Sequence, residues 1–484
     1  MTALQTTISE YVRAGFPGLW IQSHEHEDAI SEIAAVAQEN NWTLETWSPS
    51  DENRQLPDVI RQHAQTQADS RGLLILRNPH RLIDTPYTVQ VLAESLWAGK
   101  SAARHIIILC PNPGPIPPEC EKLITVIRHA LPDADTLTMI AGELATEPGE
   151  LPDDRDDRRA IARQASGLTR TQAEDAFSLS LVRNRRIDPE VISDLKADAL
   201  AQGGLLTLYR GGERFANLGG LAALKNHAQE LIRPYSRARI RGRGLLLVGV
   251  PGTGKSHFAK ALGVESGRPV LNFDCGRLTS KYVGETEERT RQALEIADAM
   301  APAVLFVDEI EKALAGAASG NTGDSGVGQR QLGALLTWLQ DHVSDVFVIA
   351  TSNDVTKLPP ALYRSGRIDA VYFLDSPSRA EKDAIWPIYQ TDGLEGFARP
   401  DDTHWSGCEI RACCDDALRA LENGSADPIR AVAGRIRPNV LKDPSDIERQ
   451  RQWAMANALS AETGQGYTRT PSQTTDQGRR AVAR

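Results

Sequence analysis

A glycine-rich run in the second half of the chain leaves few folds open to it: residues 249–256 read Gly-Val-Pro-Gly-Thr-Gly-Lys-Ser. The run fits the pattern G-x-x-x-x-G-K-[ST], follows the apolar residues 245–248 and precedes a helical stretch at 257–265. Glycines let backbone N–H groups turn inward around phosphate oxygens, and the start of a helix adds partial positive charge. The run therefore indicates a strand–loop–helix unit with a nucleotide-phosphate site. The residues expected there are Pro251, Gly252, Thr253, Gly254, Lys255, Ser256 and His257.

Two carboxylates at the end of another apolar run predict a metal ion beside the phosphates. Asp308 and Glu309 follow the strand-like residues 304–307, and Asp308 comes 53 residues after Lys255 (308 − 255). Both would repel a polyphosphate unless a cation stood between them. We expect Lys255 to reach the β- and γ-phosphates, Ser256 and Asp308 to hold Mg²⁺, and Glu309 to act as the general base on water.

A polar amide ends a third run of this kind. Residues 347–350 are apolar and Asn353 follows them after Thr351 and Ser352. Asn353 is expected to orient the attacking water or to sense the γ-phosphate. The alternative is a turn-forming asparagine, which is common after strands.

Short apolar runs followed by longer helical stretches recur along the whole chain. They begin at residues 19, 73 and 106 in the first half and at 245, 304 and 347 in the second. Parallel strands covered on both faces need no polar alternation, so the pattern predicts an α/β fold. The runs are 54 and 33 residues apart in the first half and 59 and 43 in the second. We therefore expect one architecture used twice, although any two α/β domains have broadly similar spacings.

Composition suggests the domain boundaries. Residues 146–159 are charged and contain proline, glycine pairs occur at 203–204 and 211–212, and the chain from Gly464 has no apolar face. We predict a degenerate α/β domain at 1–150, a helical lid-like region and linker at 151–210, an α/β nucleotide-binding core at 211–378, a helical lid with C-terminal helices at 379–463, and a disordered tail at 464–484.

The overall composition excludes several classes of protein. Lys plus Arg is 54 and Asp plus Glu is 64, and a net charge of −10 argues against a general nucleic-acid coat protein. No apolar run approaches the roughly 18–20 residues of a membrane span, and no secretory signal is recognised. Six cysteines in 484 residues form no disulfide framework. We expect a soluble cytoplasmic protein without a membrane partner.

Taken together, these motifs resemble the AAA+ ATPases, in particular the branch of katanin- and spastin-like machines, over about residues 213–425. At finer grain, the whole chain resembles the AAA proteins known as hypothetical chloroplast reading frames. The resemblance implies a P-loop AAA+ module with a helical lid, which is preceded here by a degenerate AAA-like module. It also implies a homo-oligomer, in particular a hexamer, that binds ATP and Mg²⁺ and acts on a protein partner.

The resemblance assigns roles to further residues. Residues 215–221 (Phe-Ala-Asn-Leu-Gly-Gly-Leu) look like the family's segment around adenine, which places Leu218 and Gly219 at the base. Residues 406–409 (Ser-Gly-Cys-Glu) stand where the family opens its lid helix, with Gly407 at the nucleotide. Arg364 and Arg367 correspond to arginine fingers that act on ATP in the neighbouring subunit. Tyr282 and Val283 correspond to a pore loop that grips an extended peptide.

The matching positions in the first half carry different chemistry. The run that begins at residue 19 is followed by Gln22-Ser23-His24-Glu25-His26-Glu27-Asp28, which contains neither a glycine cradle nor a lysine. The run that begins at 73 is followed by Arg77 and Asn78 rather than by two carboxylates. We predict that this half binds no ATP and serves as a scaffold or partner surface. His24 and His26 stand beside acids, but two loop histidines in this spacing are more often solvated than metal-bound.

Three functions remain open at this level. The first is an oligomeric Mg²⁺-dependent ATPase that remodels or threads a protein. The second is an ATP-gated binding module, in which slow hydrolysis acts as a timer and the inactive first half recruits the partner. The third, a nucleic-acid translocase, is the weakest, because only the basic cluster at 233–243 supports it.

Overall fold

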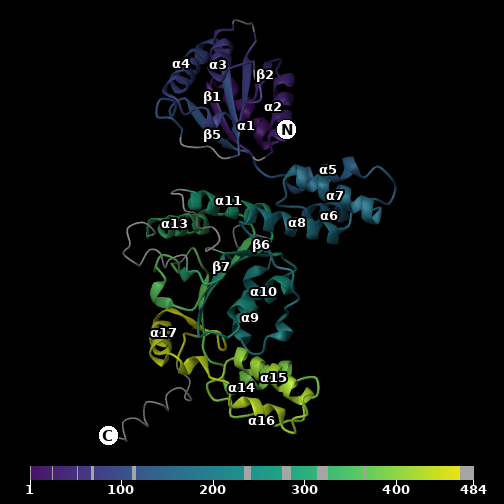
Figure 1. Cartoon of the computed structure of the whole chain (residues 1–484), viewed down its shortest axis with the longest axis vertical. Coiled ribbons are helices and arrows are strands. Elements are labelled where there is room, and N and C mark those ends of the chain that lie inside the picture. Colours follow the sequence, from purple (N-terminus) through teal and green to yellow (C-terminus); the bar gives the residue numbers. More distant parts are fainter. Residues whose placement is uncertain are drawn as a thin grey trace. The chain divides into compact units, whose positions relative to one another are not determined.

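The computed structural model describes residues 2–23, 25–51, 53–66, 70–111, 116–233, 241–274, 285–312, 325–364 and 366–468. The chain divides into two compact units, residues 1–193 and 194–484 (Figure 1). Each unit is built around one sheet, which is parallel in the first unit and parallel except for one edge strand in the second. None of the helices in the described ranges has both the length and the apolar character needed to cross a bilayer.

The first unit holds a parallel five-stranded sheet: β1 (Gly18–Gln22), β2 (Thr43–Trp47), β3 (Gly72–Arg77), β4 (Arg104–Cys110) and β5 (Ile124–Arg128). The strands lie in the order β2-β3-β4-β1-β5. Successive residues of a strand face opposite sides of the sheet, so Leu19 and Ile21 enter one hydrophobic cluster and Trp20 enters the other.

Helices cover both faces of this sheet. The first two helices pack on one face and the next two on the other. These are α1 (Ala3–Arg13) and α2 (His26–Glu39), then α3 (Leu56–Gln65) and α4 (Pro86–Ala102), with the short 3₁₀ helix η1 (Pro79–Arg81) between them. A helical region follows: α5 (Ala134–Leu144), α6 (Arg155–Gln164), α7 (Arg170–Asn184) and α8 (Pro189–Gly203), the last of which continues into the second unit.

The second unit holds a seven-stranded sheet. Its strands are β6 (Thr207–Leu208), β7 (Gly244–Gly249), β8 (Val270–Phe273), β9 (Ala303–Val307), β10 (Val346–Ser352), β11 (Ala370–Leu374) and β12 (Leu459–Ser460). They lie in the order β12-β11-β7-β10-β9-β8-β6, and only β6 runs antiparallel to its neighbour. Strands β7, β9 and β10 are completely buried, which matches the apolar runs in the sequence.

Helices again cover both faces, and a separate helical group forms a lid. On one face lie α9 (Ala222–Ile232) and α10 (Lys255–Ser266); on the other lie α11 (Glu285–Ala299), α13 (Ser325–Asp341) and α17 (Pro444–Asn457). The lid helices α14 (Arg379–Tyr389), α15 (Gly407–Glu422) and α16 (Pro428–Ala433) share a hydrophobic core of their own. Short 3₁₀ helices are η2 (Phe215–Asn217), η3 (Val355–Lys357) and η4 (Asn439–Leu441).

The two sheets share one strand order. If the strands β1–β5 and β7–β11 are each numbered along the chain, both sets read fifth-first-fourth-third-second, and the second sheet adds β12 and β6 at its two edges. This agreement confirms the prediction of one architecture used twice. It also makes positions in the two units comparable: β1 corresponds to β7, β5 to β11, and α2 to α10.

The first residues of the expected disordered tail are packed against the sheet. The Tyr467 side chain is only 5% exposed, its ring meets Phe373 edge-to-face at 4.7 Å, and its hydroxyl donates to Asp375. The Tyr467 backbone N–H also donates to Ala458 O at 2.9 Å. A disordered tail from Gly464 is therefore wrong for residues 464–468, because one aromatic side chain anchors this segment. Residues 469–484 lie outside the described part of the chain.

We expect Tyr467→Ala to lower the free energy of unfolding of the second unit by about 3 kcal/mol, since truncating a buried aromatic leaves a cavity. Urea unfolding of the full chain measures the change. The adjacent Thr468 is exposed, so Thr468→Ala is the matched control and should leave stability unchanged. Equal stability of the two variants would contradict the anchoring role of Tyr467.

Candidate active site

A cavity of about 340 Å³ opens at the carboxyl ends of the strands in the second unit. It is bordered by the loop after β7, the ends of β9 and β10, the start of α10, and the lid helices α14 and α15. Residues predicted from the sequence for the nucleotide and its metal gather around this cavity: Leu218, Gly219, Pro251, Gly252, Thr253, Gly254, Lys255, Ser256, His257, Asp308, Glu309, Asn353 and Gly407.

The loop between β7 and α10 needs its glycines. Gly252 and Gly254 have φ angles of 84° and 93°, in the left-handed region that side chains avoid. A Cβ atom at Gly252 would also lie 2.2 Å from the Cys408 Sγ of the lid. Helix α10 starts at Lys255, and the residue before it, Gly254, provides no side-chain cap. Its first N–H groups are therefore left for an anion, and the helix dipole favours negative charge there.

Lys255 is buried within this loop. Its Nζ donates to Gly249 O at 2.7 Å and to Val250 O at 2.9 Å, which holds the ammonium group at the cavity wall. Burial lowers the pKa of Lys255 to about 8, although the nearby carboxylates of Glu311, Asp308 and Glu309 act to raise it. An ammonium group has three donors, so Lys255 can bind a phosphate oxygen while keeping a backbone contact.

The polar end of the cavity is organised around Thr351, which the sequence analysis did not single out. Its hydroxyl donates to Asp308 Oδ1 at 2.5 Å and accepts from the Glu309 backbone N–H at 3.0 Å. Ser256 Oγ donates to the same Asp308 oxygen at 3.1 Å. Strands β9 and β10 are neighbours, so Thr351 ties the two strand ends together and sets the positions of both carboxylates.

Glu309 and Asn353 also meet directly. Asn353 Nδ2 donates to Glu309 Oε1 at 3.2 Å, and the Glu309 backbone has a φ of 49°, which is unusual for a residue with a side chain. The backbone of Asn353 is held on both sides, by Glu311 Oε1 at 2.9 Å from its N–H and by Gln450 Nε2 at 2.8 Å from its carbonyl oxygen. This fixed backbone presents the Asn353 amide to Glu309.

The opposite end of the cavity is formed by the segment before α9 and by the lid. A Cβ atom at Gly219 would lie 2.6 Å from the Ile385 side chain, so this glycine allows the segment to approach α14. The lid is tied to the phosphate loop, because the Cys408 N–H donates to Gly252 O at 3.2 Å. Sequence reasoning missed several lining residues, since their elements are far apart in the chain: Thr351, Asp375, Pro377, Glu381, Ile385, Tyr389 and Arg411.

The two predicted arginine fingers do not line this cavity. Arg364 and Arg367 lie instead at a second, open cavity of about 470 Å³, together with Arg243 and Gln340. Arg367 is held there by Ala361 O at 2.7 Å and by Gln340 Oε1 at 3.1 Å. The expected pore-loop residues Tyr282 and Val283 fall outside the described residues.

The described arginines Arg241 and Arg243 of the basic cluster at 233–243 give little support to nucleic-acid binding. Arg243 Nη1 donates to the carbonyl oxygens of Leu339 and Gln340, both at 2.8 Å, and Arg241 donates to Val343 O. These two guanidinium groups cap backbone carbonyls near the end of α13. Residues 234–240 of the cluster are outside the described part of the chain.

A phosphate loop with a buried lysine, two carboxylates at the next strand end and a polar amide beyond them define a nucleoside triphosphatase of the P-loop class. Residues 245–376 match the family described as "ATPase family associated with various cellular activities (AAA)". Residues 4–129 and 135–203 match the N-terminal and second domains of SpoVK-like AAA ATPases.

Two relatives match the chain over most of its length, and a third matches less than half of it. An AAA domain-containing protein called ycf46 from Trieres chinensis is 33% identical over 374 residues, which cover 73% of this chain and 74% of that protein. Its namesake from Guillardia theta is 27% identical over 483 residues, 93% of this chain and 94% of that protein. The "Cell division cycle protein 48 homolog" of Archaeoglobus fulgidus is 33% identical over 224 residues, 42% of this chain and 30% of that protein. The chain belongs to the AAA ATPase family and, within it, to the ycf46 group, and it is an ATPase.

The lowered pKa of Lys255 predicts that nucleotide binding takes up a proton at alkaline pH. In the free chain Lys255 loses its charge as the pH rises through about 8. Polyphosphate favours the charged form, so above pH 8 binding requires proton uptake, and affinity for ATP should fall as the pH rises further. Calorimetry of ATP binding at pH 8.5, in buffers of different ionisation enthalpy, measures this uptake.

Lys260 lies on the same helix but outside the cavity, with its ammonium group over the Tyr209 ring. The Lys260→Gln variant should therefore keep the full proton uptake. Binding at pH 8.5 with no uptake in the wild-type chain would show that Lys255 stays charged without nucleotide.

Proposed function

We propose that this chain works as a ring-shaped homo-oligomer, in particular a hexamer, that couples Mg²⁺-dependent ATP hydrolysis to the remodelling of a protein partner. The single observation that carries the proposal is the separation of two half-sites on one chain. Lys255, Asp308 and Glu309 line one cavity, whereas Arg364 and Arg367 line another. Two such half-sites make one complete site when copies of the chain stand side by side.

The residues at the first half-site suit ATP with Mg²⁺. Ser256 and Asp308 offer the hydroxyl and carboxylate oxygens that Mg²⁺ prefers, 3.1 Å apart, and would hold it. Bound there, Mg²⁺ would neutralise charge on the phosphate oxygens. The glycine loop and the uncapped start of α10 bind and orient the phosphates, and Lys255 adds a positive charge.

Glu309 is the residue proposed to take the proton from the attacking water. Its carboxylate lines the cavity and is positioned by the Asn353 amide at 3.2 Å. Glu309 is also ion-paired with Lys312, which is 69% exposed and can swing away without loss of packing. Asn353 would orient the same water, because its amide can contact Glu309 and the γ-phosphate region together.

Arg364 and Arg367 are proposed to complete the site of the adjoining copy. A guanidinium group offsets the negative charge that develops on the transferred phosphoryl group. Arg367 is held by Ala361 and Gln340, so it would meet the neighbouring site as part of a pre-formed surface.

A second candidate function is an ATP-gated binding module in which hydrolysis acts as a timer. What favours it is the first unit, which has the same sheet order as the ATPase core but carries Ser23 and Glu25 where the core carries its phosphate loop. In this second function the chain still forms a ring and hydrolyses ATP, but the first unit recruits the partner and hydrolysis only limits how long the partner stays bound. The remodelling version additionally needs Tyr282 and Val283 to grip the partner.

Replacing Glu309 by glutamine should lower ATP turnover by on the order of 100-fold while ATP binding is retained, as expected when a general base is lost. Steady-state phosphate release and fluorescent-nucleotide binding measure the two quantities. Glu422 is exposed at the end of α15, so Glu422→Gln is the matched control. If Glu309→Gln hydrolyses ATP as fast as this control, Glu309 is not the general base.

Mixing two inactive variants tests whether the arginines act between copies. Lys255→Ala disables the phosphate loop, and Arg364→Ala disables the second half-site, so each variant alone should show little turnover. In a mixture, an intact pocket on an Arg364→Ala chain can meet an intact arginine on a Lys255→Ala neighbour, and part of the activity should return. A mixture of Lys255→Ala with Glu309→Gln is the control, because both changes lie in the same half-site. No recovery in the first mixture would contradict a site shared between copies.

A further inference from the structure

A second cluster of ionisable side chains lies in the first unit, at the position that corresponds to the nucleotide cavity of the second. Because the two sheets share one strand order, the loop after β1, the start of α2 and the end of β5 match the phosphate loop, the start of α10 and the end of β11. In the second unit these three places line the nucleotide cavity. In the first unit the same three places carry Ser23, the pair Asp28 and Glu32, and His129.

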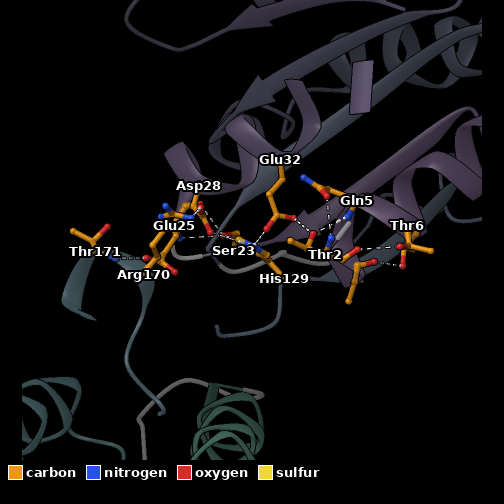
Figure 2. Close-up of polar contacts among 12 residues, drawn as sticks. Thr2, Gln5, Thr6, Ser23, Glu25, Asp28, Glu32, His129, Arg170 and Thr171 are labelled. Carbon is orange, nitrogen blue, oxygen red and sulfur yellow. Dashed lines mark hydrogen bonds and ion pairs between the residues drawn. The ribbon is translucent and has the colours of Figure 1, made fainter. Parts of the chain in front are cut away.

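Three ligand-type atoms converge in this cluster (Figure 2). His129 Nε2 lies 3.7 Å from Asp28 Oδ2 and 3.9 Å from Glu32 Oε1. Each of the three residues offers one ligand atom within 4.8 Å of those of the other two. These separations are longer than hydrogen bonds. The three atoms therefore surround a gap instead of bonding to each other.

The other polar atom of each side chain is already occupied. His129 Nδ1 is hydrogen-bonded to Ser23 Oγ at 2.8 Å, and Glu32 Oε2 accepts from Thr2 Oγ1 at 2.5 Å. Asp28 Oδ1 faces Arg170 Nη1 at 3.5 Å. Each side chain is thus held in its orientation by a partner on its second polar atom, as metal ligands are held by their outer-shell partners.

The histidine is the least exposed of the three side chains. The His129 side chain is only 8% exposed, and its Nε2 makes no hydrogen bond of normal length to any described residue. Two carboxylate oxygens face this nitrogen at 3.7 and 3.9 Å, and one nitrogen with two oxygens is a set of atoms that a divalent metal ion binds. Here that atom points into the gap between two carboxylates.

We propose that Asp28, Glu32 and His129 form a divalent metal site, for which Zn²⁺ is the best-matched ion. One imidazole nitrogen and two carboxylate oxygens are ligands that Zn²⁺ binds at about 2.0–2.2 Å. Atoms 3.7–3.9 Å apart can share one ion at such distances after a small contraction. Three protein ligands leave room for water as a fourth. Mg²⁺ is a poorer match, since it prefers oxygen ligands in octahedral geometry.

The site would also connect the sheet of the first unit to its helical region. Arg170, which faces Asp28, is the first residue of α7, and the Thr171 N–H donates to Glu25 Oε1 at 2.9 Å (Figure 2). In the second unit, the Cys408 N–H at the start of α15 likewise contacts Gly252 O in the loop after β7. The metal would therefore occupy the place of a nucleotide, between a sheet and a helix start, in a unit that lacks a phosphate loop.

Zinc binding to the full chain, freed of metal by chelation and free of nucleotide, tests the proposal. Equilibrium dialysis followed by elemental analysis should find one tightly bound Zn²⁺ per chain that is lost in Asp28→Asn and in His129→Gln. Ser23→Ala removes the hydroxyl that orients His129 and that also bonds the Glu25 backbone, but it removes none of the three proposed ligands. Its zinc affinity should therefore fall by about 10–100-fold with the site retained. Substitution by Co²⁺ should give the absorption of a nitrogen and oxygen site, without the charge-transfer band of a thiolate.

His63 offers a matched control, because it is another buried histidine with a carboxylate oxygen, Glu45 Oε2, at 4.0 Å. His63→Gln should keep the bound Zn²⁺. Retained ATP turnover in each variant shows that the second unit is folded, and an unchanged circular-dichroism spectrum of the full chain shows that the first unit is folded too. The proposal is overturned if the wild-type chain binds no stoichiometric Zn²⁺, if His129→Gln binds it as tightly as the wild-type chain, or if the Co²⁺ spectrum is that of cysteine ligands.

Discussion

The contact between the phosphate loop and the strand that precedes it underlies the rest of the active unit. Lys255 is buried against the carbonyl oxygens of Gly249 and Val250, and burial lowers its pKa to about 8. Burying an ammonium group is costly unless it is bonded, so the loop has to wrap tightly around it. That tight turn in turn needs left-handed backbone at Gly252 and Gly254, and it leaves the start of α10 open for an anion. The carboxylates and the lid border the same cavity as this loop, so they can act on a nucleotide only if the loop holds it there.

The two units show how one strand order can support two different kinds of binding site. Their sheets share one strand order, and in both units a helix start contacts the loop that follows the first strand. In the second unit this loop is rich in glycine, and it can accept a polyphosphate. In the first unit Glu25, Asp28 and Glu32 occupy the matching region, and their negative charge would repel a phosphate but attract a cation. The side chains at the strand ends therefore determine which ligand can bind, whereas the buried strands determine only the position of the site.

Most of the fold could be predicted where strands are fully buried. The runs at residues 19, 73, 106, 245, 304 and 347 are apolar throughout because helices cover both faces, and each is a strand in the structure. Strands β2 and β5 were missed because they are partly exposed and mix polar with apolar residues, while β8 is short. The tail was misjudged at Tyr467, since one aromatic residue in a polar segment gives no periodic signal.

The sequence by itself determined the phosphate loop, the acidic pair and the amide after the third strand, because each is a local pattern whose chemistry depends on neighbouring residues. Only the tertiary structure brought Thr351 between the two carboxylates, separated the arginines from the cavity of their own chain, and assembled His129 with Asp28 and Glu32. His129 is about a hundred residues from its two partners, a separation (129 − 28 = 101) over which no local pattern extends. The physical reason is the parallel sheet: its strand order is set by packing of whole elements, and this order decides which strand ends become neighbours.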